Sequence, residues 1–384
     1  MKNLVFKNAL KGTIFPLISF INKLIPKSDK RVLLHIPNKR LVYSLGPIKD
    51  YLIENGFDKK YNISYGFLDL DRFGDANWVK TLAMIRSMLI FMRAKHVFYT
   101  SGQIPIKPSK SQIVIHVQHG NADFKPVGKL ANIDNGDEFF FTYMIAPSEL
   151  YVPIMAKEYE CSEECIKIAG DPMTDALLKA PKNVYDFSSF KKVLIWTPTF
   201  RQSDLMGYKD SDLNTLVPLF DGEDYQSLNN LLAEYNIRLI VKLHPIQTTP
   251  VNMQRHFSHL SVYSHDEFVE SKYDILTLMA NSDGMIGDYS SISMQYLLTD
   301  KPQAFVVPDI DDYGSNRGFV FEHPEDYMGG HIIKTKDEFT QFIKDFAEDN
   351  DLYRDKRHWV CEQVYKYKDA NSCARIIKLS EMCI

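Results

Sequence analysis

Cysteine is scarce in this chain, with five residues at positions 161, 165, 361, 373 and 383 among 384. So small and odd a number excludes a disulfide framework and is typical of a reducing compartment. Cys161 and Cys165 lie four positions apart, but no histidine or second cysteine pair follows at the spacing of a zinc site. Zinc at this pair is therefore the weaker alternative.

A strong excess of charge and a long apolar run are also absent. The net charge of -4 argues against general nucleic-acid binding but is compatible with local basic patches. The apolar stretch near the N-terminus is interrupted by Pro16, Asn22 and Lys23, and is too short to span a bilayer. Ile25-Pro26-Lys27 behind it is a poor cleavage site, which argues against a secretory signal.

The first 30 residues combine lysines with apolar residues between positions 14 and 25, and Asp29 is the single acid among them. This pattern predicts an amphipathic segment that lies on an anionic membrane surface. The expected helix runs from about Thr13 to Leu24, with Pro16 in its first turn, where proline is tolerated. The alternative is a helix packed on the core of the protein itself.

From Arg31 onward, short apolar runs alternate with helical periods, and no short repeat or low-complexity stretch interrupts them. This alternation predicts an α/β protein with two doubly wound, Rossmann-like domains. We expect the first domain at 31–180, a linker at 179–189 and the second domain at 190–338. The tail, 339–384, is expected to form helices that pack back on the first domain.

The stretch DGMIGDYSSISMQY at 283–296 predicts a buried strand, a tight turn and a helix, and an apolar run at 304–307 supplies a further parallel strand. Ser290 and Ser291 would present two hydroxyls beside unpaired backbone N–H groups at the helix start, which suits a phosphate. The alternative is that Asp288 or Ser290 only caps the helix.

Three further polar motifs follow predicted strands, at the edge where open α/β sheets bind ligands. They are HGN with His119, TPTFR with Thr197, Thr199 and Arg201, and LHP with His244. A single histidine in a loop is weak evidence for function, but two histidines, an arginine and a serine-rich turn at strand ends together predict a site for a phosphate-bearing substrate.

Seven motifs in order carry a resemblance to a known family: HGN at 119, SE at 148, GDPMTDAL at 170, WTPTFR at 196, VKLHP at 241, GDYSSIS at 287 and DDYGSNRG at 311. Over residues 110–320 the chain resembles the CDP-glycerol glycerophosphotransferases, which make teichoic-acid and related capsule polymers. The sequence departs from that family at Asn121 and Gly287, where threonines are usual.

The resemblance implies a two-domain fold like that of GT-B glycosyltransferases, peripheral attachment to the cytoplasmic face of the membrane, and no obligatory metal. It identifies His119 as the general base and His244 as a catalytic residue beside the donor pyrophosphate. It also matches Ser290, Ser291 and Arg317 to donor-binding groups of the family. Their positions after predicted strands add Thr197, Thr199, Arg201 and Asp288 to the expected donor-binding residues. Asp311 and Asp312, with Asp309 nearby, form a loop expected to bind polyol hydroxyls or an arginine.

The resulting hypothesis is transfer of glycerol phosphate or ribitol phosphate from CDP-glycerol or CDP-ribitol to a lipid-linked saccharide or growing polymer, with release of CMP. Two alternatives stay open. One is a glycosyltransferase that uses a CMP- or UDP-activated sugar, because such an enzyme needs the same phosphate contacts. The other is a non-catalytic membrane-bound module that holds nucleotide or polymer. The sequence does not decide between a monomer and a homo-oligomer.

Overall fold

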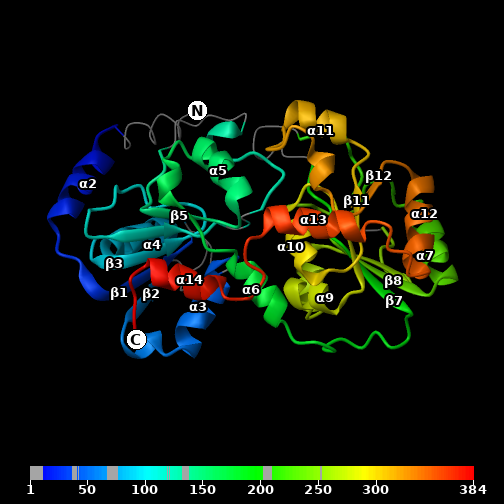
Figure 1. The fold of residues 1–384 in the computed structure, drawn as a ribbon, viewed down its shortest axis with the longest axis horizontal. Coiled ribbons are helices and arrows are strands. Elements are labelled where there is room, and N and C mark those ends of the chain that lie inside the picture. Colours follow the sequence, from blue (N-terminus) through cyan, green and yellow to red (C-terminus); the bar gives the residue numbers. More distant parts are fainter. Residues whose placement is uncertain are drawn as a thin grey trace. The chain divides into compact units, whose positions relative to one another are not determined.

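The computed structural model describes residues 12–36, 41, 43–66, 77–118, 120, 122–131, 138–201, 210–250 and 253–384. The chain divides into two compact units (Figure 1). The first comprises Met1–Asn121, Asp134–Asp175 and Lys366–Ile384, and the second Ala122–Ile133 and Ala176–Tyr365. Within the described ranges, none of the helices combines the length and apolarity that a bilayer span requires.

The first unit contains a six-stranded sheet in the order β2-β1-β3-β4-β5-β6, and every adjacent pair is parallel. Its strands are β1 Ser28–His35, β2 Asn62–Tyr65, β3 Ala94–Tyr99, β4 Ile113–His116, β5 Tyr143–Ala146 and β6 Ile166–Ile168. Its helices are α2 Ile14–Leu24, α3 Leu45–Glu54, α4 Asn77–Phe91, α5 Val152–Glu158 and α14 Ser372–Leu379. Helix α6, Pro172–Lys179, carries the chain from the first unit into the second.

The second unit repeats this plan with the order β12-β11-β10-β7-β8-β9, again with parallel neighbours. Its strands are β7 Lys192–Trp196, β8 Ile237–Lys242, β9 Leu260–Tyr263, β10 Gly284–Gly287, β11 Gln303–Val306 and β12 His331–Ile333. Its helices are α7 Tyr225–Glu234, α8 His265–Glu270, α9 Ile275–Asn281, α10 Ser291–Tyr296, α11 Ile310–Asn316, α12 Lys336–Ala347 and α13 Arg354–Val364.

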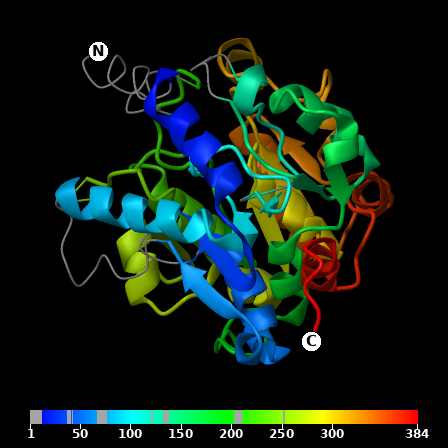
Figure 2. The same ribbon diagram turned by 90° about the vertical axis from the view of Figure 1, so that its left-hand side faces the viewer.

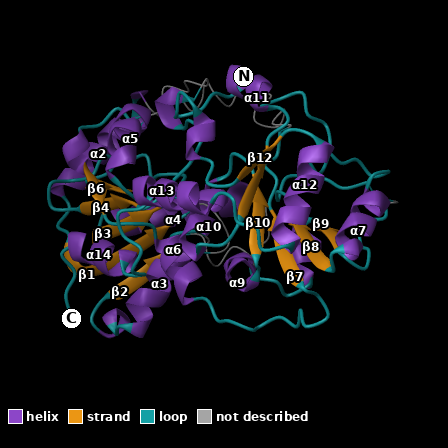
Figure 3. Cartoon of the chain, turned by 45° about the vertical axis from the view of Figure 1, so that its right-hand side comes forward, coloured by secondary structure: helices purple, strands orange, loops and turns teal. Residues whose placement is uncertain are grey.

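Helices cover both faces of each sheet (Figure 3), because successive strand residues point to opposite faces. In β7, Leu194 and Trp196 pack in one core with α7 and α12, whereas Val193 and Ile195 pack in another with α8 and α9. In β1, Val32 and Leu34 face α3 and α14, and Leu33 packs with Phe91 of α4. The prediction of two doubly wound parallel domains is confirmed.

Two expected boundaries differ from the structure. Of the tail expected on the first domain, α12 buries Phe339, Phe342 and Phe346 in the core of the second unit, and only 366–384 belong to the first. The expected assignment of α12 and α13 is therefore wrong: α12 follows β12 and shares one core with α7 on its own sheet, and α13 belongs to the same unit. The expected linker at 179–189 is also packed, since Tyr185 and Phe187 contact the core of the second unit.

Candidate active site at one edge of the second sheet

Four neighbouring strands of the second sheet end at the same edge, and each is followed by one of the polar segments of interest. The strands β8, β7, β10 and β11 end at residues 242, 196, 287 and 306. Because the strands are parallel, the segments that contain His244, Thr197–Arg201, Asp288–Ser291 and Asp309–Asp312 leave the sheet on one side. The edge therefore gathers, from one unit, most of the residues that sequence analysis singled out.

A buried ionic network occupies the middle of this edge. Asp288 is fully buried and accepts hydrogen bonds from the backbone N–H of Thr199 at 2.7 Å and from its hydroxyl at 2.6 Å. The Arg201 guanidinium donates to Asp288, to the Thr199 carbonyl at 2.7 Å and, through Nε at 3.1 Å, to Asp309. Tyr289 adds its ring, 5.0 Å from the Arg201 guanidinium carbon, and a hydroxyl bond to Asp309 at 3.1 Å.

The network fixes the charge states of its members. Although burial alone would lower it, the neighbouring carboxylates of Asp288 and Asp309 raise the pKa of Arg201 above its ordinary value. Burial would raise the pKa of Asp309, but Arg201 outweighs it and lowers that pKa. An arginine with two carboxylate partners is saturated. The expected contact of Arg201 with donor phosphates is therefore not what the structure favours; Arg201 positions the turns around it.

The same bonds remove Asp288 as a cap of α10. Its carboxylate is directed at Thr199 and Arg201, and Ser290, the residue before the helix, makes no capping bond through its side chain. Ser290 and Ser291 are half-buried, and neither hydroxyl is hydrogen-bonded to any of the residues that the structure describes. The interpretation of this turn as a simple cap is thus unsupported. The two serine hydroxyls at the sheet edge are available to a ligand.

Thr197 contributes a third open hydroxyl. Its backbone N–H donates to the carbonyl of Ile286 at 3.2 Å, which ties the end of β7 to β10. Its Oγ1 is buried and has no hydrogen-bond partner in the described part of the chain. A buried hydroxyl without a partner is costly unless a ligand or water completes it.

His244 stands at the exit of β8 with its ring stacked on that of Phe200, the centroids 5.8 Å apart. Loss of surrounding water, assisted by Lys125, Lys242 and His265, lowers the pKa of His244 to about 4, although part of the side chain stays exposed. Its Nδ1 accepts from the backbone N–H of Ile246 at 3.3 Å. The neutral ring therefore carries its proton on Nε2, where it can donate to an oxyanion.

Gly287 permits the close approach of β10 to α10. A Cβ at this position would lie 2.0 Å from the Ser293 hydroxyl oxygen and 2.9 Å from its Cβ. Ser293 is fully buried. The glycine that replaces the usual threonine is therefore matched to the packing of the helix that opens with Ser290 and Ser291.

The remaining predicted residues of this unit lie at its rim. Arg317 follows α11, with its Nε 3.8 Å from a carboxylate oxygen of Asp210. Asp312 accepts from the backbone N–H of Asp212 at 2.6 Å and from the Asn316 amide at 2.8 Å, whereas Asp311 is exposed. Asp309, which precedes these two residues, pairs with Arg201, and the role of Asp311 and Asp312 in binding substrate stays a prediction.

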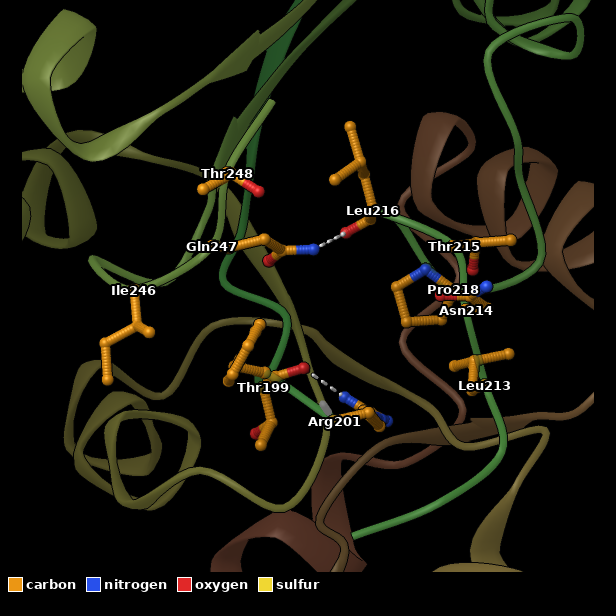
Figure 4. A pocket seen from close by; sticks show the side chains of 11 residues that line it. Thr199, Arg201, Leu213, Asn214, Thr215, Leu216, Pro218, Ile246, Gln247 and Thr248 are labelled. Carbon is orange, nitrogen blue, oxygen red and sulfur yellow. Dashed lines mark hydrogen bonds between the residues drawn. The ribbon is translucent and has the colours of Figure 1, made fainter. Parts of the chain in front are cut away.

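A pocket of about 270 Å³ opens beside this edge, between three stretches at 199–201, 213–218 and 246–248 (Figure 4). The Gln247 amide donates to the Leu216 carbonyl at 3.5 Å. Buried oxygens of Thr215 and Gln247 lack partners among the described residues. Of the lining that the structure describes, Arg201 alone is charged, and its guanidinium is already paired. The pocket is therefore neutral and polar.

His119 and Asn121 lie outside the described residues, so the role of His119 as the general base stays a prediction. His116, at the end of β4, is buried and stacked on Tyr99 with ring centroids 4.5 Å apart. The GDPMTDAL motif has a structural role: the Asp175 carboxylate accepts from the backbone N–H groups of Ser372 and Cys373 at 3.0 and 2.8 Å. It thereby fixes the start of α14.

Two parallel sheets, each covered by helices, with polar motifs at strand ends, define a protein of the GT-B type. The solved structure of the wall teichoic acid polymerase TagF is similar, with a TM-score of 0.71 and 19% identity over 99% of this chain and 95% of that one. Residues 17–380 match the family described as CDP-glycerol:poly(glycerophosphate) glycerophosphotransferase, and the chain belongs to that family.

Curated relatives include the teichoic acid ribitol-phosphate polymerase TarK of Staphylococcus aureus, 27% identical over 70% of this chain and 52% of its own length. The chain thus spans about half of that relative. The teichoic acid poly(glycerol phosphate) polymerase of Bacillus spizizenii is 23% identical over 91% of this chain and 93% of its own. The relatives therefore include proteins named for glycerol phosphate and for ribitol phosphate.

Proposed function

We propose that this chain transfers glycerol phosphate or ribitol phosphate from a CDP-activated donor to a hydroxyl of a lipid-linked saccharide or growing polymer, and releases CMP. The observation that carries the proposal is the family match over residues 17–380. The open hydroxyls at the edge of the second sheet supply phosphate ligands for such a donor. TagF, the similar structure, has also been solved as a variant soaked with CDPG.

In the proposed reaction, the acceptor oxygen forms a bond to the phosphorus that carries the polyol. The bond between that phosphorus and the oxygen of CMP breaks, and CMP leaves with the electron pair. His119 takes the proton of the acceptor hydroxyl, a task that suits an imidazole. Negative charge then develops on the departing CMP, and hydrogen-bond donors fixed in advance stabilise it.

The donor phosphates are assigned to four groups: Nε2 of neutral His244 and the hydroxyls of Thr197, Ser290 and Ser291. Each is a donor without a partner in the described part of the chain, and all belong to strand ends at one edge. Arg317 is a further candidate at the rim. Thr199, Arg201 and Asp288 support these groups by holding the two turns, and are not assigned to the donor phosphates.

The neutral pocket suits the uncharged part of a substrate. Its polar lining, Asn214, Thr215, Gln247 and Thr248, offers hydroxyl and amide groups between apolar walls that include Leu216 and Pro218. Pockets that enclose a drug-sized ligand hold about 300–1,000 Å³, so about 270 Å³ is room for one small group. A polyol, with hydroxyls for the polar lining and C–H groups for the apolar walls, fits this description better than a phosphate.

We also propose that the chain attaches to the cytoplasmic face of the membrane through its basic N-terminal segment, since the acceptor is anchored in lipid. Helix α2 spans Ile14–Leu24, close to the expected bounds, with Pro16 in its first turn. Its Leu17, Phe20 and Leu24 side chains are exposed.

The decisive experiment measures nucleotide release by the purified full chain, as CMP from CDP-glycerol or CDP-ribitol and as UDP from a UDP-sugar, each offered with a lipid-linked saccharide. Release from a CDP-polyol is expected. His119→Ala should lower turnover by roughly 10² or more with donor affinity retained, and His244→Ala should weaken donor binding as well. Transfer from the UDP-sugar alone would establish a glycosyltransferase, and donor binding without any release would establish a binding module.

A further inference from the structure

Two strands at the centre of the first sheet, β3 and β4, lead into buried polar side chains. Thr100 directly follows β3 and leaves 1% of its surface exposed, and Gln118, two residues beyond β4, leaves 6%. Among the residues that the structure describes, neither the Thr100 Oγ1 nor the Gln118 Nε2 has a hydrogen-bond partner. Polar groups buried to this degree are costly unless a ligand or water completes their hydrogen bonds.

The strand register places these two residues side by side. Tyr99 and His116 are Cα partners in the parallel pair of β3 and β4. The backbone N–H of Val117 donates to the Tyr99 carbonyl at 2.9 Å, which extends the ladder by one residue. Neighbouring strands lie about 4.8 Å apart. Thr100 and Gln118 therefore leave the sheet at adjacent points of its carboxyl edge, in the unit that faces the viewer in Figure 2.

Two histidines fix the loop that begins with Thr100. His116 donates through Nε2 to the Thr100 carbonyl, and His35 donates through Nε2 to the Gly102 carbonyl at 2.9 Å. Burial lowers the pKa of His35 to about 4, so its ring is neutral near physiological pH. These bonds hold the backbone of the loop and leave the Thr100 hydroxyl to another partner.

Gln118 has a strained backbone. Its φ is 55°, in the left-handed region that residues other than glycine, asparagine and aspartate seldom adopt. Strained residues of this kind gather at functional sites, where the surrounding structure enforces them. His119, the predicted general base, is the next residue in the chain. The strain and the buried amide thus lie directly before the residue that is predicted to take the proton of the acceptor.

The stretches that follow the two strands are polar and uncharged. Residues 100–106 and 117–118 contain no charged side chain, whereas phosphate sites rely on cations or on the N–H groups of a helix start. An amide N–H donates to a hydroxyl oxygen, and a threonine hydroxyl can accept from another hydroxyl. Two neighbouring hydroxyls of an uncharged sugar or polyol unit match this pair of groups.

We propose that the Thr100 hydroxyl and the Gln118 amide bind two neighbouring hydroxyls of the acceptor, at the end that is extended. The proposal rests on the proposed function, which requires an acceptor hydroxyl, and adds two residues that contact the acceptor and not the donor. Both side chains bind and orient the acceptor and take no part in proton transfer. Their loss should therefore affect acceptor affinity and leave donor affinity unchanged.

The test measures the dissociation constant of soluble acceptors by calorimetric titration of the full chain without donor. The probes are a glycerol phosphate oligomer and a disaccharide glycoside. Thr100→Val should raise the dissociation constant of the acceptor that binds by roughly ten-fold, because a hydroxyl of the ligand loses its partner. Thr100→Ser should restore most of the affinity. The dissociation constant of CDP-glycerol should stay unchanged in both variants.

Two substitutions separate the amide of Gln118 from its backbone. Gln118→Gly relieves the strain and removes the amide, so the variant should fold and still lose acceptor affinity roughly ten-fold. Thr142→Val is the matched control at the other end of β4, where the Thr142 hydroxyl accepts from the backbone N–H of Val114 at 3.0 Å. The control should lose stability and keep its acceptor affinity.

An acceptor analogue tests the same contacts without any change to the protein. Replacing the hydroxyl beside the extended one by hydrogen should weaken binding to the unaltered chain and have little effect on the Thr100→Val variant that carries Gln118→Gly as well. Equal affinity of the unaltered chain for the acceptor and its analogue overturns the proposal.

The proposal is also overturned if Thr100→Val and Gln118→Gly bind the acceptor as the unaltered chain does, if the loss appears in donor affinity, or if the unaltered chain binds neither probe. CMP release from a CDP-polyol separates the two hypotheses. Normal release with unchanged acceptor affinity in both variants refutes the acceptor site only. Acceptor binding that depends on both residues, without any release, refutes the proposed function only.

Discussion

At the scale of single residues, the turn after β10 separates saturated polar groups from open ones. The Asp288 carboxylate already accepts hydrogen bonds from Thr199 and Arg201. The hydroxyls of Ser290 and Ser291, two and three residues later, have no hydrogen-bond partner among the described residues. The sequence marks all of these as candidates for phosphate binding, because residue type and spacing are equally suitable. The paired and unpaired groups differ in whether an opposite charge lies beside them in the fold. Strand order determines which charges become neighbours.

One signal for the ionic network was present in the sequence. Arg201, Asp288 and Asp309 follow three strands, β7, β10 and β11, that are neighbours in the sheet. Opposite charges after adjacent parallel strands meet at one edge, so the pairing follows once the order is known. The order itself depends on which crossover places β10 beside β7, and no local pattern specifies that.

Replacement of Ser290 or Ser291 by alanine should weaken donor binding without loss of stability. Each change removes a hydrogen bond to a charged oxygen, worth about 1.5–3 kcal/mol, so the dissociation constant of CDP-glycerol should rise roughly ten-fold or more. Calorimetric titration measures it. Thr199→Val is the matched control, because its hydroxyl donates to Asp288 at 2.6 Å and not to the donor phosphates. This variant should lose stability. A serine variant that unfolds readily but binds donor normally would contradict the assignment.

His244 should titrate near pH 4, and not near 6.5, in the free protein. Its ring is then neutral from pH 7 down to about pH 5, whereas the same residue in the unfolded chain takes up a proton below 6.5. The unfolded state binds more protons in that window, so this residue lowers stability as pH falls from 6.5 towards 4 and has no effect above it. NMR titration of the imidazole measures the midpoint.

Lys125→Ala should move that midpoint upward, because the lysine charge is one cause of the lowered pKa of His244. Lys344→Ala on α12 is the control, since this lysine is exposed in the same unit and does not contribute to the lowered pKa of His244. An unchanged midpoint in the Lys125 variant would show that the charge of Lys125 does not contribute to the lowered pKa of His244.

At the scale of elements, the strand, turn, helix and strand expected from 283 to 307 are present as β10, α10 and β11, with β10 and β11 parallel. This unit was predictable because its apolar runs are short and its turn is marked by polar residues. The tail was harder. Helix α12 has an apolar face that suits either domain, so the pattern alone does not identify its partner.

The contact between Gly287 and Ser293 should set how large a residue the β10 turn accepts. Gly287→Ala should lower the free energy of unfolding by about 1–3 kcal/mol, the usual effect of overpacking, because its Cβ would meet the Ser293 hydroxyl. Adding Ser293→Gly should restore part of the loss. Urea denaturation measures both, and equal stability of the single and double variants would contradict the contact.

At the scale of the whole molecule, the two-domain plan was predictable from the alternation of strands and helices, but the path of the chain between the domains was not. The structure assigns 122–133 to the second unit and 366–384 to the first. Such exchanges depend on a few anchoring side chains. Phe124 is one of them, fully buried against Phe305 with ring centroids 6.3 Å apart.

Ile376→Ala in α14 should therefore destabilise the first unit, and Ile343→Ala in α12 the second. Both side chains are fully buried, and loss of such a side chain costs about 2–5 kcal/mol. Hydrogen exchange should show faster opening of β1 amides in the Ile376 variant and of β8 amides in the Ile343 variant. Faster exchange of β8 amides in the Ile376 variant would show that α14 stabilises the second unit, and would contradict its assignment to the first.

The return of residues 366–384 to the first unit has a consequence for how the protein is made. A ribosome synthesises β1 to β6 first, yet Ile376, Ile377 and Cys373, which cover one face of that sheet, emerge only after the entire second unit. The domain begun first is thus the last to be completed. During translation its α14 site stays uncovered, and the nascent chain carries an exposed apolar patch for as long as 176–365 take to be synthesised.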